Sequence, residues 1–367
     1  MNSKNKIEDL GYTPFFEAGR NQLDLGDFSI ARVISEFRGA YKVKNLEGEC
    51  FAKLTGKQAH EGSSREDYPA VGDWVAITEL DIGLATIQGV LPRSTVIKRK
   101  YGDKNRPGKK DGVQIIATNI DVAFIVESVD RDYNLNRFER YFVIVKDGGV
   151  KPVIILNKID LIQKEKLDEI VIQIKNRFPE VKIILTSADN NEGISELISF
   201  ISKGKTYCFL GSSGVGKSSL INKLLGEDTI KTGDISSYSD RGKHVTTGRQ
   251  MYFLENGGIV IDNPGIREVG LSDVGLGIDS YFDEIESLSQ KCKFNDCTHT
   301  HEKGCEVIDA VKSGKIDGEK YSSYIDLRKE AEYFEMNDVE KRKKNRQVGK
   351  FMKNAKKELK DRRRKNR

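Results

Sequence analysis

Apolar and polar positions alternate in short stretches along the first part of the chain. Five stretches are rich in β-branched and aromatic residues, and Gly or Asp separates them. Stretches of this kind are typical of short strands, and five at this spacing predict a small β-barrel that ends near residue 112. The predicted strands are residues 28–37, 40–46, 50–56, 73–80 and 84–91. Residues 98–112 are polar, basic and glycine-containing, which predicts a linker or mobile loop.

From residue 113 to 271 apolar runs alternate with stretches of helical periodicity. This alternation predicts an α/β domain with a mostly parallel sheet that helices cover on both faces. We expect strands at 121–129, 150–158, 181–188, 205–213 and 258–265. We expect helices at 135–147, 165–178, 194–203 and 216–226.

Beyond residue 271 the chain becomes charged and helical, which predicts a mostly helical domain over 272–340. Residues 341–367 contain helix formers but few apolar residues, so we expect this tail to be partly disordered alone and to fold on binding. No apolar run approaches the roughly 18 residues of a membrane span. The start of the chain also lacks the apolar stretch of a secretory signal. We therefore expect a cytoplasmic protein with no membrane partner, and a monomer.

Charge is distributed unevenly along the 367 residues, whose formal net charge is +5. The tail 341–367 holds 15 Lys and Arg against 2 Asp and Glu, a net charge of +13. Of the totals of 61 basic and 56 acidic residues, 46 and 54 remain for the first 340 positions, a net charge of -8. An acidic body with a basic tail favours a polyanionic partner, and we expect RNA.

A phosphate-binding motif, GSSGVGKS, lies between an apolar run and a helix-like stretch, which is the context that it requires. Its glycines let backbone N–H groups point at phosphates, beside the positive end of the helix dipole. Lys217 is expected to reach the β- and γ-phosphates and Ser218 to bind magnesium. The predicted phosphate-binding residues are Gly211, Ser212, Ser213, Gly214, Val215, Gly216, Lys217, Ser218 and Ser219.

A guanine-binding motif, NKID, comes earlier in the chain and ends another predicted strand. The carboxylate of Asp160 can accept hydrogen bonds from N1 and N2 of guanine, a donor pair that adenine lacks. Asn157 is expected to hold neighbouring loops. The segment TSA, at 186–188, ends the next strand, where backbone N–H groups can meet guanine O6. The predicted base-binding residues are Asn157, Lys158, Ile159, Asp160, Ser187 and Ala188.

A third motif, DNPG, ends a later strand at Asp262–Gly265. Asp262 is expected to hold magnesium through water, and the N–H of Gly265 to face the γ-phosphate. Between the phosphate loop and this motif lies RGKHVTTGR, in which Thr246 or Thr247 is the predicted switch threonine on magnesium and the γ-phosphate. Because the guanine motif precedes the phosphate loop, the domain is predicted to be a circularly permuted P-loop GTPase.

Three of the five cysteines gather with a histidine late in the chain. Three thiolates and an imidazole make a closed tetrahedral set of the kind that holds structural zinc, and an odd, clustered set disfavours a disulfide framework. The predicted ligands are Cys292, Cys297, His299 and Cys305, with His301 as a competitor of His299. We expect zinc to supply much of the folding free energy of this charged segment. Cys50 and Cys208 are predicted to be buried strand residues.

The nucleotide motifs resemble those of the translation-factor-related GTPases in circularly permuted order. The segments around these motifs resemble the YjeQ/RsgA family in particular, and the resemblance covers nearly the whole chain. The segments that carry it are VGDWV, LPRS, RGKHVTT, DNPGIRE and the Cys/His spacing. The resemblance implies a GTPase that depends on the small ribosomal subunit and acts late in its assembly. The implied cofactors are GTP or GDP, magnesium and one structural zinc. The resemblance also favours His299 over His301 as the zinc ligand.

The position after DNPG, where many GTPases carry a water-orienting Gln, is Ile266. An apolar side chain cannot orient water, so intrinsic hydrolysis is expected to be slow. His244, in the switch segment, is the candidate for this role once a partner orders the segment, and the alternative is that it contacts the partner or solvent.

The first domain resembles an oligonucleotide-binding (OB) barrel, which binds single strands on a basic, aromatic-bearing face. Candidates for that face are Tyr41, Lys42, Lys44, Lys53 and Lys57, whereas Trp74 is predicted to lie in the core. The charge density of the basic tail predicts RNA contact more strongly than the barrel face does. The expected partners are the 16S-type rRNA and proteins of the small subunit.

The leading hypothesis is a GTPase that binds the small subunit in its GTP form and leaves after subunit-stimulated hydrolysis. One alternative is a permuted GTPase of large-subunit assembly, against which the barrel and the Cys/His module count. Another alternative is an RNA-binding assembly scaffold with incidental hydrolysis. It stays open because Ile266 stands where a water-orienting Gln would be expected in an efficient GTPase.

Overall fold

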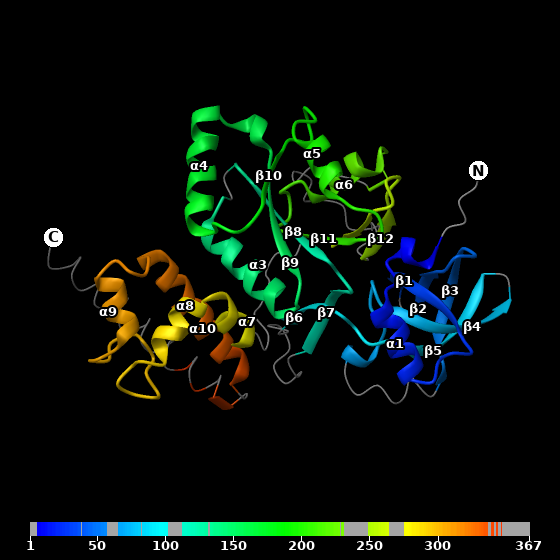
Figure 1. Cartoon of the computed structure of the whole chain (residues 1–367), viewed down its shortest axis with the longest axis horizontal. Coiled ribbons are helices and arrows are strands. Elements are labelled where there is room, and N and C mark those ends of the chain that lie inside the picture. Colours follow the sequence, from blue (N-terminus) through cyan, green and yellow to red (C-terminus); the bar gives the residue numbers. More distant parts are fainter. Residues whose placement is uncertain are drawn as a thin grey trace. The chain divides into compact units, whose positions relative to one another are not determined.

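The computed structural model describes residues 6–37, 39–56, 65–81, 83–101, 112–130, 133–227, 229–230, 249–263, 275–336, 339–340, 343 and 346. The chain divides into two compact units, Met1–Gly270 and Leu271–Arg367 (Figure 1). The predicted boundaries at residues 112, 271 and 340 stay predictions.

The first part of the larger unit is a closed β-barrel, as predicted. Its strands follow the order β1-β2-β3-β5-β4, and β4 pairs with β1 to close the ring. The inner face is apolar and includes Ala31, Val33, Val43 and Ile87. The strands are β1 (Ser29–Phe37), β2 (Ala40–Lys44), β3 (Glu49–Leu54), β4 (Trp74–Asp81) and β5 (Leu84–Val90). The order of pairing is that of an OB-like barrel.

An N-terminal helix that the sequence pattern did not predict covers one side of the barrel. It is α1 (Pro14–Gln22), preceded by a 3₁₀ turn over Ile7–Leu10. Pro14 stands at the start of the helix, where its missing N–H costs nothing. Tyr12 meets the ring of Trp74 edge-on at 4.8 Å between centroids, and Trp74 is fully buried. The prediction that Trp74 belongs to the core is confirmed.

The prediction of a linker over residues 98–112 is wrong at both ends of that segment. Strands β6 (Val96–Tyr101) and β7 (Gly112–Thr118) pair as an antiparallel hairpin. Ile97 and Ile116 are fully buried, so the apolar residues that flank the basic segment anchor the hairpin. Residues 102–111 lie outside the described part of the chain.

The α/β part carries a parallel sheet whose strands follow the order β10-β9-β8-β11-β13. Its strands are β8 (Val122–Ser128), β9 (Lys151–Asn157), β10 (Ile183–Thr186), β11 (Thr206–Leu210) and β13 (Ile259–Asp262). Strand β12 (Gln250–Phe253), which was not predicted, adds to β13 in antiparallel direction. The helices are α3 (Leu135–Asp147), α4 (Lys164–Arg177), α5 (Ile194–Phe200) and α6 (Lys217–Leu225).

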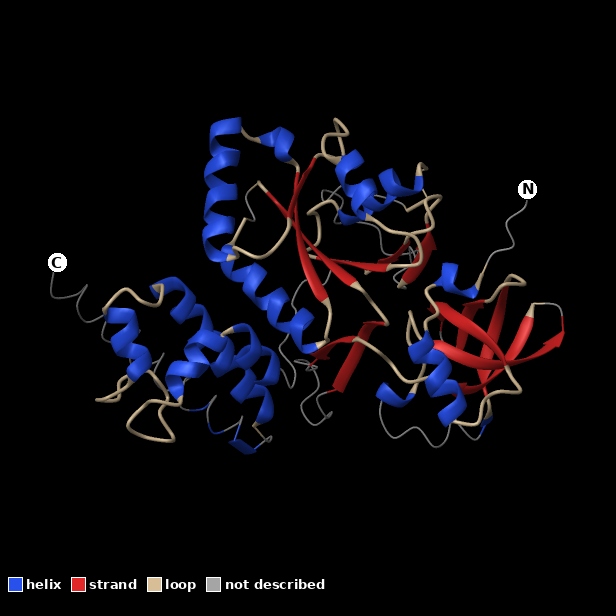
Figure 2. Cartoon of the chain, in the orientation of Figure 1, coloured by secondary structure: helices blue, strands red, loops and turns tan. Residues whose placement is uncertain are grey.

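The helices cover both faces of this sheet, as predicted (Figure 2). Leu197 of α5 and Leu220 of α6 pack with Phe124, Val153 and Val260 of the strands. On the other face, Phe142 of α3 meets Phe178, which follows α4, at 4.8 Å between ring centroids. The strand order reverses between β8 and β11, which makes this pair the switch point of the sheet. In sheets of this kind, ligands bind at the switch point, beside the carboxyl ends of the strands.

The barrel and the α/β sheet are joined edge to edge within the larger unit. Ser35 of β1 pairs with Gln250 of β12, which links all these strands into one eleven-stranded sheet. The buried guanidinium of Arg32 donates to the carbonyl oxygens of Leu10 and Asn119 at 2.6 and 3.0 Å, and so bonds the barrel to the segment that enters β8.

The smaller unit is helical, as predicted. Its helices are α7 (Gly275–Tyr281), α8 (Asp283–Ser289), α9 (Glu306–Lys312) and α10 (Gly318–Glu335). Phe282 and Tyr324 are fully buried and lie 5.3 Å apart between ring centroids. Among the described residues, no helix is both long and apolar enough to cross a membrane.

Candidate nucleotide site and metal centre

The phosphate loop connects the end of β11 to the start of α6, and its glycines are required by geometry. Gly216 has φ of +98°, and a Cβ there would lie 2.2 Å from Nδ2 of Asn157. Gly211 has φ of +147°, and a Cβ there would lie 2.3 Å from the carbonyl oxygen of Val126. These positions tolerate no side chain, because the neighbouring strands approach the loop too closely.

Lys217 is buried beneath this loop. Its Nζ donates to the carbonyl oxygens of Gly211 and Ser212 at 2.8 and 2.7 Å. Burial lowers the pKa of Lys217 to about 8, and the nearby carboxylates of Asp262 and Glu127 oppose this shift. The ammonium is therefore held by the carbonyl groups of its own loop, at the site where the motif places the phosphates.

The guanine motif is bonded to the phosphate loop through Asn157, which is buried. Nδ2 of Asn157 donates to the carbonyl oxygen of Val215 at 2.8 Å. Its Oδ1 accepts from the hydroxyl of Thr186 at 3.0 Å. The side chain of Asn157 thus connects its own loop to the segments around Thr186 and Val215. Asn157 was predicted to hold neighbouring loops in this way.

Lys158 follows in the left-handed region with φ of +61°. Its Nζ forms an ion pair with Asp130 at 3.0 Å. Asp130 was not predicted to belong to the site, and this contact fixes the direction of the lysine stem.

Asp160 and Ser187 are in direct contact, with the hydroxyl of Ser187 donating to the carboxylate. The backbone N–H of Ser187 donates to the carbonyl oxygen of Glu192 at 2.9 Å. This N–H is therefore already used within the turn, which leaves the N–H of Ala188 as the stronger candidate for guanine O6.

Asp262 ends β13 beside Lys217 and fits a magnesium site. Burial raises the pKa of Asp262, which the charge of Lys217 opposes. Within the described chain, its buried Oδ1 contacts no hydrogen-bond donor. A buried carboxylate oxygen without a donor is a suitable acceptor for a hydrated cation, and Ser218 lies in the first turn of the adjacent helix α6. The predicted residues His244, Thr246, Thr247 and Gly265, and Ile266 with them, lie outside the described residues.

Strand β8 and helix α3 contribute residues to the site that sequence reasoning missed. Glu127, fully buried, pairs with Arg137 at 3.1 Å and lies close enough to oppose the pKa shift of Lys217. Burial raises the pKa of Tyr141 on α3, and its interaction with Ser212 of the phosphate loop opposes this shift. The sequence did contain a signal for Glu127, since it is an acidic residue near the end of an otherwise apolar strand. Ligands of parallel sheets bind at the carboxyl ends of the strands, so a polar residue there is a candidate for the site.

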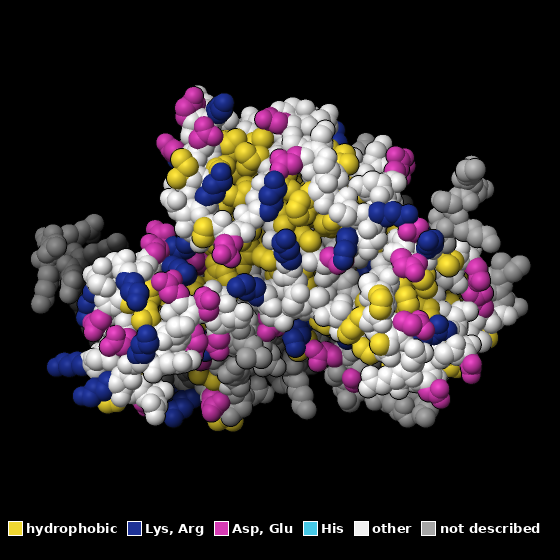
Figure 3. All heavy atoms as spheres, in the orientation of Figure 1, with side chains coloured by type: hydrophobic (Ala, Val, Ile, Leu, Met, Phe, Trp, Pro, Cys, Tyr) yellow, Lys and Arg dark blue, Asp and Glu magenta, His cyan; other side chains and the backbone are white. Residues whose placement is uncertain are grey.

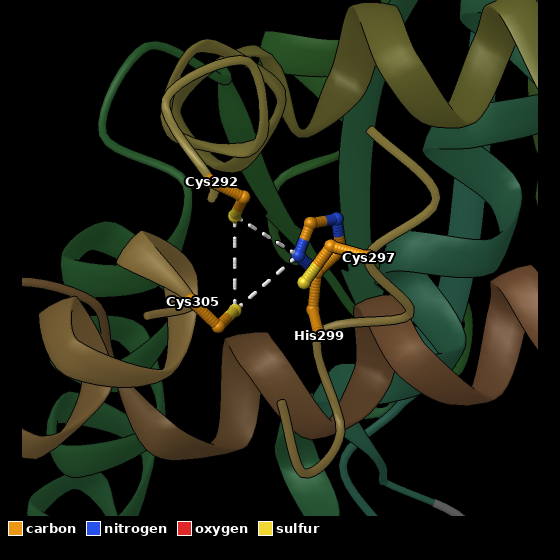
Figure 4. Close-up of side chains that lie close together, drawn as sticks. All are labelled: Cys292, Cys297, His299 and Cys305. Atoms are coloured by element: carbon orange, nitrogen blue, oxygen red, sulfur yellow. Dashed lines mark hydrogen bonds between the residues drawn. The ribbon is translucent and has the colours of Figure 1, made fainter. Parts of the chain in front are cut away.

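The four residues predicted as metal ligands lie together in the smaller unit (Figure 4). Sγ of Cys292 is 3.8 Å from Sγ of Cys305, and Nδ1 of His299 is 3.6 and 3.4 Å from these two sulfurs. All four ligand atoms, with Cys297 included, lie within 4.8 Å of one another. Tetrahedral zinc bonded to sulfur and nitrogen separates its ligand atoms by roughly 3.5–3.8 Å. The donor set can therefore hold a metal ion.

The backbone around the cluster supports this arrangement. Cys305 is the N-cap of α9, and its sulfur accepts from the N–H of Ile308 at 3.4 Å. The hydroxyl of Tyr321 donates to the carbonyl oxygen of His299 at 2.6 Å. Burial lowers the pKa of His299, which keeps its imidazole neutral, as a ligand must be. His301 is exposed and hydrogen-bonded to Thr300, outside the cluster.

Several smaller predictions need correction. Tyr41 is buried in the barrel core, so it does not belong to an exposed nucleic-acid face. Cys208 is buried as predicted, but Cys50 is only half-buried. Lys57 lies outside the described residues, as does most of the tail beyond residue 340.

A guanine-binding loop bonded to a phosphate loop that follows it in sequence defines a circularly permuted GTPase. Residues 90–272 match the family model described as RsgA GTPase. The chain belongs to the RsgA GTPase family, and it is a GTP hydrolase. GTP, GDP and magnesium are the ligands that this class of enzyme uses.

Curated relatives match over most of their length. A protein of Bacteroides thetaiotaomicron named small ribosomal subunit biogenesis GTPase RsgA 1 is 37% identical over 97% of this chain and 98% of its own. A protein of Lactiplantibacillus plantarum named small ribosomal subunit biogenesis GTPase RsgA 2 is 41% identical over 84% of this chain and 85% of its own. Residues 206–347 also match a second family model, described as 50S ribosome-binding GTPase.

Solved structures share the fold. YjeQ from Thermotoga maritima superposes with a TM-score of 0.58 at 24% identity, over 81% of this chain and 96% of that one. YloQ, described as a circularly permuted GTPase, superposes with a TM-score of 0.58 at 22% identity, over 84% of this chain and 96% of that one. At these identities the likeness concerns the fold alone, and it agrees with the permuted order of the motifs.

Proposed function

We propose that this chain acts late in maturation of the small ribosomal subunit, binds the subunit in its GTP form and leaves after subunit-stimulated hydrolysis. The observation that carries the proposal is the joined nucleotide site, in which Asn157 bonds to Val215 of the phosphate loop at 2.8 Å. The small subunit is proposed as the partner because both relatives are named small ribosomal subunit biogenesis GTPases.

The nucleotide is bound from two sides. Asp160 accepts from N1 and N2 of guanine after releasing the hydroxyl of Ser187, and the N–H of Ala188 meets O6. Lys217 exchanges the two carbonyl oxygens that it now contacts for the β- and γ-phosphates. The N–H groups from Gly211 to Ser219 surround the phosphates.

Ser218, Asp262 and either Thr246 or Thr247 are the residues that hold magnesium in this proposal. Bound magnesium neutralises charge that develops on the phosphates. The N–H of Gly265 faces the γ-phosphate, and His244 orients the attacking water once the subunit orders the switch segment. Because Ile266 cannot orient water, turnover without the subunit is slow.

The metal of the smaller unit is one structural zinc held by Cys292, Cys297, His299 and Cys305. Four protein ligands leave no open coordination position, so the ion stabilises the module and takes no part in hydrolysis. The module, the barrel and the basic tail contact 16S-type rRNA and proteins of the subunit. The chain acts as a monomer in the cytoplasm.

The decisive measurement is GTP turnover with no ribosomal subunit, with purified small subunits and with purified large subunits. We expect slow turnover alone and strong stimulation by small subunits only. The variant Asp160→Asn tests the base contact, since an amide both donates and accepts and cannot match both guanine donors. Guanine nucleotide affinity is expected to fall in this variant while the unfolding temperature stays the same.

A second candidate is action on the large subunit, which the match of residues 206–347 to the 50S ribosome-binding GTPase model favours. Stimulation by large subunits only supports this candidate. Absence of stimulation by either subunit supports an RNA-binding scaffold with incidental hydrolysis.

A further inference from the structure

Asp130, which lies two residues past the end of β8, contacts the lysine of the guanine motif. Strands β8 and β9 pair in parallel, with Ser128 opposite Asn157, the last residue of each strand. Because parallel strands end at the same edge of a sheet, Asp130 and Lys158 leave that edge side by side. Nζ of Lys158 lies 3.0 Å from Oδ2 of Asp130. The pairing of the two strands therefore sets this ion pair.

Both members of the ion pair are fixed by bonds of their own. The hydroxyl of Ser128 donates to Oδ1 of Asp130 at 2.7 Å, and the carbonyl oxygen of Asp130 accepts from the N–H of Tyr133 at 3.2 Å. The backbone of Lys158 has φ of +61°, and its carbonyl oxygen accepts from the N–H of Leu161 at 3.0 Å. The backbone and the ammonium of Lys158 are thus both held, which leaves the four-carbon stem between them little freedom.

This ion pair differs from the exposed ion pairs of the surface. Lys and Arg side chains lie among Asp and Glu side chains over much of the face shown in Figure 3. Exposed pairs contribute little, as at Lys182–Glu196, where the side chains are 49% and 50% exposed. The side chains of Lys158 and Asp130 are only 30% and 28% exposed, so solvent screens their attraction less. Their pair also lies next to the residues that are proposed to bind the base.

We propose that Asp130 is a positioning residue for guanine, which holds the stem of Lys158 along the face of the base. The inference rests on the proposed function, in which Asp160 accepts from N1 and N2 at the edge of the same base. A lysine side chain loses rotamer freedom when it packs against a ligand, and an ion pair that already fixes the side chain removes that cost. The stem presents apolar surface to the base while its charge stays with Asp130.

The sign of the expected effect distinguishes positioning from simple electrostatics. GDP is strongly negative, so removal of a nearby carboxylate strengthens its binding if only overall charge matters. Loss of a carboxylate that orders Lys158 weakens binding instead. Asp130→Asn and Asp130→Ala are therefore expected to weaken GDP binding by about fivefold, which is the size of the ordering cost of one long side chain.

Titration of the full chain with a fluorescent GDP analogue tests the inference through a double-mutant cycle. Lys158→Met keeps an apolar stem but carries no ammonium. Asp130→Asn is expected to weaken binding in the unmodified chain and to have no effect in the Lys158→Met background. The matched control is Asp189→Asn, which neutralises an exposed aspartate just after the base-binding segment at 186–188. This control is expected not to weaken GDP binding.

A second nucleotide tests whether Asp130 acts at the face of the base. Inosine diphosphate shares the ring faces of GDP but lacks the N2 donor at the edge. Asp130→Asn is expected to weaken the binding of both nucleotides by the same factor. Thermal unfolding without nucleotide identifies any variant that loses its fold, and the isosteric Asp130→Asn is the test if Asp130→Ala does so. An equal effect of Asp130→Asn in both backgrounds, or no weakening in the unmodified chain, would overturn the inference.

The same titrations separate this inference from the proposed function. If Asp160→Asn weakens GDP binding and Asp130→Asn does not, the base lies where proposed and only the role of Asp130 is wrong. If Asp160→Asn leaves GDP affinity unchanged, the proposed base contact is wrong and the role of Asp130 fails with it.

Discussion

Nδ2 of Asn157 donates to the carbonyl oxygen of Val215 over 2.8 Å and a sequence separation of 58 residues. The same side chain accepts from the hydroxyl of Thr186. One amide therefore holds the two base-binding segments against the phosphate loop. In a permuted domain this bond connects segments whose order in the chain is reversed relative to an ordinary GTPase.

Asn157→Ala is expected to weaken GTP and GDP binding to a similar degree, by roughly tenfold. Its removal leaves the buried carbonyl of Val215 and hydroxyl of Thr186 without partners, which costs about 1–3 kcal/mol. Titration with a fluorescent GDP analogue measures the effect. The control is Asn190→Ala, since the side chain of Asn190 is exposed and bonds only to the neighbouring Glu192. Equal affinities of the two variants would contradict the role given to Asn157.

Gly216→Ala is expected to abolish nucleotide binding, because its Cβ would lie 2.2 Å from Nδ2 of Asn157. The control is Gly226→Ala. Gly226 also has positive φ, +75°, but no atom lies within 4 Å of its Cβ position. Both variants incur backbone strain of about 1–2 kcal/mol, and only Gly216→Ala clashes. Thermal unfolding and GDP titration compare them, and retained GDP binding by Gly216→Ala would refute the described loop geometry.

Nucleotide affinity is expected to fall as the pH rises through about 8, because burial lowers the pKa of Lys217 to about 8. The phosphates require the charged ammonium, which is fully populated only below this pH. Lys217→Arg carries a charge that persists to much higher pH. Its affinity, whatever its absolute value, is therefore expected to be independent of pH between 7 and about 9. Titrations across this range check the prediction, and a flat profile for the unmodified chain would contradict it.

Chelation of the bound metal is expected to unfold the smaller unit first. Cys305→Ser is expected to do the same, since it removes one of four ligands, whereas a serine can still serve as the N-cap of α9. Metal analysis is expected to find one zinc per chain. Near-ultraviolet circular dichroism follows the loss of packing around Phe282 and Tyr324. The controls are Cys50→Ser in the barrel and His301→Ala beside the cluster, neither of which is expected to release metal.

The sequence determined the barrel, the parallel sheet and the four-residue metal cluster. Apolar periodicity reports burial directly, as at Phe124 and Ile155, which are fully buried strand residues. The nucleotide motifs could be recognised in the sequence because each requires particular residue types at closely spaced positions. Gly211 and Gly216 of the phosphate loop are examples. The metal ligands lie within 14 consecutive residues, from Cys292 to Cys305, so their proximity in space followed from proximity in sequence.

Only the tertiary structure decided which distant residues complete the sites. Asp130 meets Lys158 and Tyr141 meets Ser212, and each pair is brought together by strand pairing or helix packing. The same holds for Tyr41, whose side chain points into the barrel although its neighbour Lys42 points out. A strand alternates its faces, but which face becomes the core is set by closure of the whole barrel, since closure decides where apolar surface leaves water.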